Sequence, residues 1–129
     1  MKGLIIEDER EIAKALVEDL RKLRPLIEIV GTTSSIGGEV SLINDNQGLD
    51  IIFADIMIDD GMSFRVFEQV KTDAMVVFTT AYDEYALKAL DYNCADYLLK
   101  PISMEGLERA LRKCENSQHS ITPDNLHSM

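Results

Sequence analysis

The stretch Ile51-Ile52-Phe53-Ala54-Asp55 decides the fold, because it is an apolar run of strand length that ends on a carboxylate. Four further apolar runs of strand length lie elsewhere in the chain, at residues 4–6, 27–30, 75–78 and 97–99. Helical patterns separate them, at residues 9–23, 34–46, 62–71, 83–92 and from 103 onward. Strands that alternate with helices five times predict a parallel sheet covered by helices on both faces.

The helical patterns differ in strength. The first places apolar residues on one face and stops at Arg24-Pro25, because the residue before a proline is pushed out of helical geometry. Gly37 and Gly38 make the second a poor helix former. Asp83 and Ser103 are the expected N-caps of the last two helices. Other positions are expected to face the core: Phe64, Phe67 and Val70 in the third helix, and Met104, Leu107, Leu111 and Cys114 in the last.

The predicted fold class is α/β, a doubly wound five-stranded parallel sheet of flavodoxin-like (α/β)5 type. Right-handed crossovers favour the strand order 2-1-3-4-5. The switch point of that order lies between strands 1 and 3, where Asp8 and Asp55 stand. Residues 1–115 form the predicted domain, and residues 116–129 read as a polar tail or the start of a linker to a further domain.

Composition bounds the function. A chain of 129 residues is long enough for one domain with a real core. Its formal net charge of −10 repels phosphate backbones, so direct nucleic-acid binding is not expected. No apolar stretch approaches the roughly 20 residues that span a bilayer. Cys94 and Cys114 suggest neither a disulfide scaffold nor a zinc site, and a cytoplasmic location is expected.

Polar residues follow four of the predicted strands. Glu7-Asp8-Glu9 comes after the first, Asp55 ends the third, Thr80 follows the fourth and Lys100 follows the fifth. The carboxyl ends of parallel strands share one edge of a sheet, so these groups are expected to converge there. Carboxylates packed together repel unless one is protonated or a cation joins them, and oxygen ligands suit Mg²⁺.

The polar residues expected at this edge of the sheet include no histidine base and no serine or cysteine nucleophile. It offers a carboxylate that can itself attack phosphorus, with Mg²⁺ and Lys100 stabilising the charge on the transferred group. Asp55 is the expected nucleophile and Thr80 a hydroxyl donor, with phosphoaspartate as the product. Each residue alone has an ordinary structural explanation, such as an acidic helix cap or a solvated lysine. The prediction rests on the four elements together.

At this point the residues resemble a known family over about residues 2–115. The motifs IIEDE (5–9), FADIM (53–57), FTTAY (78–82) and DYLLKP (96–101) are similar in order and spacing to the receiver domain of two-component response regulators. The stretch from FTTAY to DYLLKP is especially similar to receivers that precede a LytTR-type DNA-binding domain.

The resemblance implies a role for each matching position. Asp55 accepts a phosphoryl group from a sensor histidine kinase. Asp8 ligates Mg²⁺ directly, and Glu7 holds it largely through water. The backbone carbonyl of Met57 is a further ligand. Lys100 pairs with the phosphoryl group.

Two more positions belong to the switch that the resemblance implies. Thr80 bonds the phosphoryl group and Tyr97 matches an aromatic residue that moves inward with it, although Tyr97 also fits a plain packing role. The peptide Lys100-Pro101 is expected to be cis, as is usual in the family.

The chain departs from the family pattern at three positions. Glu7 stands where the first of two aspartates is usual, Asp59 replaces a proline, and Ser63 replaces a glycine. Asp59 and Asp60 are expected to add negative potential beside the site. Met57 and Tyr82 occupy variable positions, and we expect their bulk to hinder water and prolong the phosphorylated state.

The predicted function is a phosphoacceptor receiver in two-component signal transduction, as part of a transcriptional regulator, with self-catalysed phosphotransfer and no other enzymatic activity. The expected output surface is the helix from Asp83, the fifth strand and the last helix, with homodimerisation there. One alternative is a receiver-like interaction module that is never phosphorylated. The other is a Mg²⁺-dependent aspartyl phosphatase, which generally needs an acid where Met57 stands.

Overall fold

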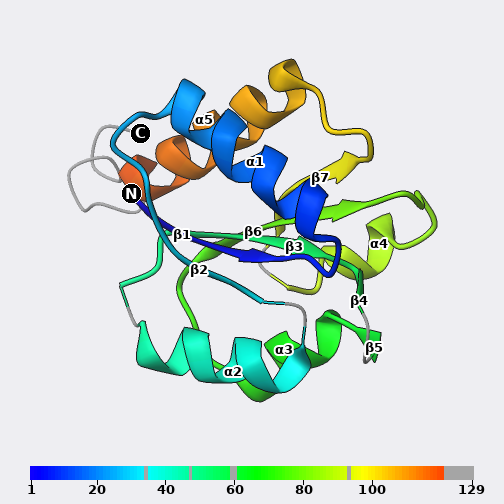
Figure 1. Cartoon of the computed structure of the whole chain (residues 1–129). Helices are drawn as coiled ribbons and strands as arrows, with labels where there is room; N and C mark the ends of the chain where they lie inside the picture. The colour runs from blue at the N-terminus through cyan, green and yellow to red at the C-terminus, as the bar shows by residue number, and fades with distance from the viewer. Residues whose placement is uncertain (34, 47, 59–60, 93, 121–129) are drawn as a thin grey trace.

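The computed structural model describes residues 1–33, 35–46, 48–58, 61–92 and 94–120. Its centre is a five-stranded sheet in the order β2-β1-β3-β6-β7, with every neighbouring pair parallel (Figure 1). The strands are β1 (Lys2–Ile6), β2 (Glu28–Thr33), β3 (Ile51–Asp55), β6 (Met75–Thr80) and β7 (Cys94–Leu99). Counted along the chain, this is the predicted order 2-1-3-4-5, so the predicted α/β fold is confirmed.

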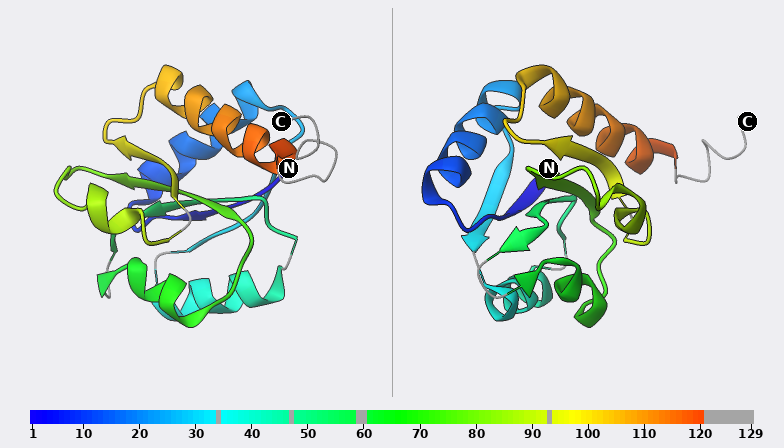
Figure 2. Two further views of the ribbon diagram at one scale, coloured as in Figure 1. Left: turned by 180° about the vertical axis from the view of Figure 1, so that it is seen from behind. Right: turned by 90° about the vertical axis from the view of Figure 1, so that its right-hand side faces the viewer.

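Helices cover both faces of the sheet. In Figure 1, α1 and α5 lie above it and α2 and α3 lie below, and the views of Figure 2 agree. The helices are α1 (Arg10–Leu23), α2 (Ile36–Asp45), α3 (Phe64–Gln69), α4 (Ala86–Ala89) and α5 (Met104–Ser120). None of them, within the described ranges, is long and apolar enough to cross a membrane.

The strand period of two divides the core into two layers. Leu4 and Ile52 pack in the layer below the sheet, whereas the next residues, Ile5 and Phe53, pack in the layer above it. All four side chains are at most 1% exposed. A chain buried on both sides in this way must be apolar throughout, which explains the uninterrupted runs that mark β1 and β3 in the sequence.

An ion-pair network joins the end of α1 to α5. The Arg24 guanidinium donates to Glu108 at 2.7 Å and to Glu115 at 2.8 Å. Arg24 is the residue before Pro25, so the residue that ends the first helix also fixes the last one. These hydrogen bonds raise the pKa of Arg24, and they lower the pKa values of both glutamates.

Two elements on the lower side differ from the prediction. β2 continues past the predicted range of 27–30 to Thr33, because β1 pairs with it as far as Thr33. The helix predicted at 34–46 begins at Ile36, with Ser35 as its N-cap and Ser34 and Gln47 outside the described residues. At Gly38 a Cβ atom would lie 2.7 Å from the Thr33 hydroxyl, so this glycine allows the helix to start close to β2.

The sequence shows no strand or helix pattern at residues 56–61. In the structure, β4 (Met57–Ile58) pairs antiparallel with β5 (Gly61–Met62) in this part of the chain. Gly61 has a φ of 135°, a conformation that favours glycine. The helix predicted at 62–71 is shorter, Phe64–Gln69, because Met62 belongs to β5 and Val70 is already extended. Phe64 is buried as expected, and Phe67 and Val70 are partly buried.

The helix predicted at 83–92 is a single short helix, Ala86–Ala89, and the assignment of Asp83 as its N-cap is wrong. The N-cap is Tyr85, and Asp83 contributes only its carbonyl, which accepts from the Ala86 amide at 3.4 Å. Within this helix Ala89 alone is buried. Leu87 is 83% exposed, so few apolar contacts hold further turns in place.

The last helix is longer than predicted. The Ser103 hydroxyl caps it by accepting from the Gly106 amide at 3.0 Å, as expected, but the helix continues past Glu115 to Ser120. Residues 121–129 of the predicted tail lie outside the described residues. Met104 is 40% exposed, so its assignment to the core is wrong, whereas Leu107, Leu111 and Cys114 are buried together with Ala110.

Candidate functional site

The predicted site residues meet at the carboxyl edge of the sheet. Glu7 and Asp8 directly follow β1, and Asp55 and Thr80 are the last residues of β3 and β6. Lys100 directly follows β7, and its amide donates to the Thr80 carbonyl at 2.8 Å. Parallel pairing of these strands therefore brings residues that are far apart in sequence to one edge (Figure 1).

Three carboxylates form the acidic cluster, which we define as Glu7, Asp8 and Asp55. One oxygen from each lies within 4.8 Å of the others. Glu7 and Asp55 are buried and Asp8 is half-buried. Carboxylates this close repel one another, so a cation stabilises their charged forms. The oxygen ligands fit Mg²⁺, which combines one or two carboxylates with water and phosphate.

Lys100 lies between two members of the acidic cluster. Its ammonium donates to Glu7 at 2.5 Å and to Asp55 at 2.8 Å, with its side chain 16% exposed. Burial opposes the charged form, but the hydrogen bonds to Asp55 and Glu7 outweigh it and raise the pKa of Lys100 above its ordinary value. The ammonium thus provides a fixed positive charge beside Asp55.

The backbone around Asp55 is also ordered by hydrogen bonds. The Met57 amide donates to Asp55 Oδ1 at 3.2 Å, which fixes the carboxylate against the loop that follows it. The amide of Ser63 donates to the Ile56 carbonyl at 2.8 Å. The Ser63 hydroxyl is buried and has no hydrogen-bond partner among the described residues. Asp59 and Asp60, with their expected effect on the local potential, lie outside the described residues.

Thr80 and Tyr97 are placed on either side of the segment after β6. The Thr80 side chain is buried, and its hydroxyl accepts from the Tyr82 amide at 3.2 Å. The Tyr97 hydroxyl donates to the Tyr82 carbonyl at 2.5 Å, and Tyr97 is only partly buried. The backbone of Tyr82 therefore contacts both predicted switch residues, Thr80 through its amide and Tyr97 through its carbonyl.

One residue near the site was not singled out from the sequence. The Tyr85 hydroxyl donates to the Met57 sulfur at 3.6 Å, which joins the segment before α4 to the loop after Asp55. Only the second aromatic in Tyr82-Asp83-Glu84-Tyr85 hinted at it, and a partly exposed tyrosine in a loop has no specific signature. The peptide Lys100-Pro101 is cis, as expected.

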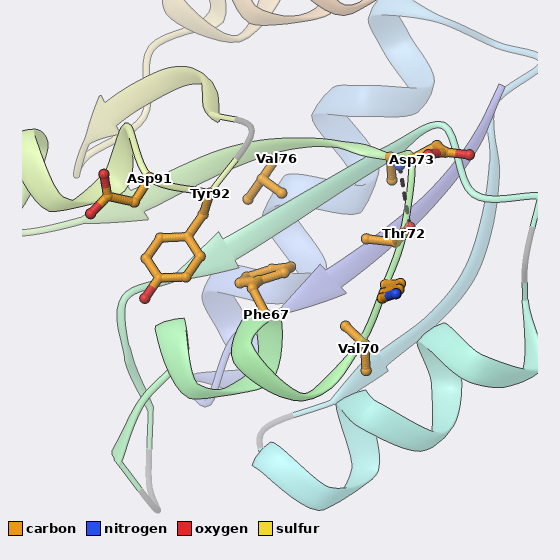
Figure 3. Close-up of a pocket in the computed structure, with 9 residues that line it drawn as sticks. Phe67, Val70, Thr72, Asp73, Val76, Asp91 and Tyr92 are labelled. Atoms are coloured by element: carbon orange, nitrogen blue, oxygen red, sulfur yellow. Dashed lines mark hydrogen bonds between the residues drawn. The ribbon is translucent and has the colours of Figure 1, made fainter.

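Two hollows lie near the sheet edges. One of about 500 Å³ is formed by α1 residues such as Ile12 and Ala15 together with Pro101 and Lys100, the lysine that contacts Glu7 and Asp55. The other, of about 460 Å³, lies at the opposite edge, around the segment that leads into β6. Figure 3 shows Phe67 and Tyr92 there, with Thr72 hydrogen-bonded at 3.2 Å to the Ala74 amide. No residue of the acidic cluster lines the second hollow.

Comparison with known proteins gives the same result as the geometry. Residues 4–112 match the response regulator receiver domain. The chain is 31% identical over 126 residues to the sensory transduction protein LytT of Bacillus anthracis, covering 93% of this chain and 49% of that protein. It is 42% identical over 81 residues to the sensory transduction protein LytR of Streptococcus mutans, covering 60% of this chain and 33% of that protein.

Among solved structures, the response regulatory domain of protein mrkE from Klebsiella pneumoniae is similar with a TM-score of 0.82 and 27% identity. The match covers 93% of this chain and 99% of that domain. The chain spans about half the length of the LytT relative, whereas it matches the isolated mrkE domain over nearly its whole length. On the extent of the family match and the convergence of strand-end residues, this chain belongs to the response regulator receiver domain family.

Proposed function

We propose that this chain is a phosphorylation-controlled switch in which Asp55 accepts a phosphoryl group from a sensor histidine kinase. The observation that carries the proposal is the placement of Asp55, which is buried within the acidic cluster and in contact with the Lys100 ammonium. Lys100, and a cation held by the three carboxylates, can neutralise the negative charge that a phosphoryl group brings to Asp55.

The residues of this chain divide the chemistry among them. In the transfer, an Asp55 oxygen forms a bond to phosphorus as the bond from phosphorus to the donor histidine breaks. Lys100 neutralises charge on the phosphoryl oxygens, and the Thr80 hydroxyl donates to one of them. Asp8, Asp55 and the Met57 carbonyl would hold Mg²⁺, with Glu7 contributing through water. When bound, Mg²⁺ supplies further positive charge to the same oxygens.

The response would leave the site through Thr80 and Tyr97. The contact of both residues with Tyr82 supports this route, since movement of Thr80 towards the phosphoryl group alters the Tyr82 amide and carbonyl together. The output surface would consist of α4, β7 and α5. The whole protein would be a cytoplasmic regulator whose DNA-binding part lies outside residues 1–129. The match to about half of the LytT and LytR relatives supports a longer protein of that kind.

The test is covalent modification of Asp55. The protein is incubated with a small phosphodonor and Mg²⁺, and intact masses are compared for the wild type, Asp55→Asn and Asp45→Asn. Asp45 is an exposed aspartate at the end of α2 and serves as a control for the loss of one carboxylate. We expect the mass of one phosphoryl group on the wild type and on Asp45→Asn, and none on Asp55→Asn.

The other functional classes give different results in the same experiment. An interaction module that is never phosphorylated would show no added mass in any variant. A phosphatase would release phosphate from small phosphomonoesters with continued turnover, whereas we propose that this chain carries out only its own phosphorylation and dephosphorylation. Equal modification of the wild type and Asp55→Asn would refute the assignment of Asp55.

A further inference from the structure

The glutamate at position 7 contacts the site lysine directly. Glu7 Oε1 lies 2.5 Å from Lys100 Nζ, and Glu7 Oε2 accepts from the Glu9 amide at 3.3 Å. The Glu7 side chain is only 3% exposed. Both of its oxygens therefore have protein donors, and the carboxylate is fixed without any other ligand.

The contact depends on the length of the glutamate side chain. An aspartate on the same backbone would withdraw the carboxylate by one carbon–carbon bond, about 1.5 Å. That change would lengthen the separation from Lys100 Nζ to roughly 4 Å, beyond hydrogen-bonding range. Lys100 would then keep its contact with Asp55, at 2.8 Å.

Charge balance gives this pair a consequence for metal binding. The acidic cluster carries three negative charges when ionised, and Lys100 supplies one positive charge in contact with two of its members. A divalent ion entering the cluster would meet the same carboxylates and would be repelled by the ammonium that Glu7 and Asp55 hold among them. Lys100 and the metal therefore compete for one set of oxygens.

We propose that Glu7 is a positioning residue that holds Lys100 in the acidic cluster, so that divalent-ion binding requires this ion pair to loosen. The pair weakens Mg²⁺ binding and stabilises the metal-free fold. This inference rests on the proposed function, because it concerns the same site, but it predicts an affinity and not the phosphorylation itself. Shortening the side chain while keeping its charge isolates the effect.

The experiment measures Mg²⁺ binding by isothermal titration calorimetry for the wild type, Glu7→Asp and Glu7→Gln, with thermal midpoints recorded in the absence of metal. Glu11→Asp is the matched control, because Glu11 is an exposed glutamate in the first turn of α1. We expect Glu7→Asp to lower the Mg²⁺ dissociation constant about tenfold, which corresponds to about 1.4 kcal/mol. Its metal-free midpoint should fall. Glu7→Gln should bind Mg²⁺ more weakly, because it removes a negative charge.

A second variant separates this role from general loosening of the fold. Lys100→Met should tighten Mg²⁺ binding in the wild-type background and have less effect in Glu7→Asp, since both changes remove the same repulsion. Equal Mg²⁺ affinities for the wild type and Glu7→Asp, with Asp55 still phosphorylated, would overturn this inference alone. Failure of every variant both to bind Mg²⁺ and to take up a phosphoryl group would overturn it together with the proposed function.

Discussion

Two large side chains follow the reactive positions, Met57 two residues after Asp55 and Tyr82 two residues after Thr80. Met57 is 44% exposed and in contact with the Tyr85 hydroxyl, and Tyr82 is 52% exposed. Neither side chain offers a carboxylate or amide that could orient an attacking water. Their bulk at the open side of the site is therefore expected to slow hydrolysis of phosphorylated Asp55.

Replacing both residues with polar ones should shorten the life of the phosphorylated state. For Met57→Asn with Tyr82→Glu, we expect hydrolysis to be about tenfold faster, which corresponds to a barrier lowered by about 1.4 kcal/mol. The decay is followed by intact mass after removal of the phosphodonor. Tyr92→Phe, distant from the site at the opposite hollow, should leave the lifetime unchanged. An unaltered lifetime in the double variant would show that access of water does not limit the decay.

The partly buried carboxylate of Asp96 joins β7 to α5. The Asp96 side chain is 9% exposed and accepts from Arg109 at 2.9 Å, with Lys113 at 3.4 Å. Burial alone would raise the pKa of Asp96, but Arg109 and the Tyr97 amide outweigh it and lower the pKa below its ordinary value of 3.8. The ion pair therefore stabilises the fold above about pH 4, and this stabilisation is lost as the pH falls through the lowered pKa.

Asp96→Asn should remove this pH dependence. Near neutral pH we expect the variant to be less stable by about 1 kcal/mol, a modest value because Arg109 and Lys113 are about half exposed. The difference should shrink in acid and vanish once Asp96 is protonated in both the folded and unfolded states. Urea unfolding at a series of pH values measures it, with Asp45→Asn as the exposed control. A constant difference at every pH would mean that packing, not charge, explains the loss.

The elements show why some parts of the fold could be predicted and others could not. Strands β1 and β3 are buried on both faces, so their residues must be apolar and the sequence marks them clearly. The strand ends, and with them Glu7, Asp8, Asp55, Thr80 and Lys100, follow from those runs and from parallel pairing. The order of the four motifs along the chain then indicates a receiver-type site.

The errors lie where tertiary contacts decide the structure. Asp83 is a common N-cap residue, yet α4 begins after Tyr85, whose hydroxyl contacts the distant Met57 sulfur. The β4–β5 hairpin involves strands of two residues, too short to show a period. The reach of Glu7 to Lys100 spans 93 positions and has no local signal.

For the molecule as a whole, the site and the proposed output surface lie at different places on one rigid sheet. α5 is anchored by Arg24 through Glu108 and Glu115 and by Asp96 through Arg109 and Lys113, and α1 and α5 share one core layer. In contrast, α4 is short and mostly exposed, with Ala89 buried. A change at Thr80 would therefore displace the segment around α4 more easily than α5, so the output surface would be reshaped mainly on its α4 side.

The exposed apolar residues of that surface make its use testable. Leu87 and Leu90 are 83% and 69% exposed at α4, and Leu99 at the end of β7 and Met104 at the start of α5 are 49% and 40% exposed. Burial of such residues against a second copy would be favourable at about 25 cal/mol per Å² of apolar area. We expect phosphorylation to convert the protein from monomer to dimer, and Leu87→Glu with Leu90→Glu to prevent the dimer while leaving phosphorylation of Asp55 intact.

Sedimentation velocity with and without the phosphodonor measures this conversion. Leu26→Glu is the control, because Leu26 is 94% exposed but lies in the turn before β2, away from α4. The control variant should dimerise like the wild type, whereas the α4 variant should remain monomeric even when its mass shows full phosphorylation. A wild type that stays monomeric after phosphorylation would contradict the predicted dimer, and the exposed leucines of α4 would then be available to a different partner. A dimer that survives both α4 substitutions would place the interface elsewhere on the molecule.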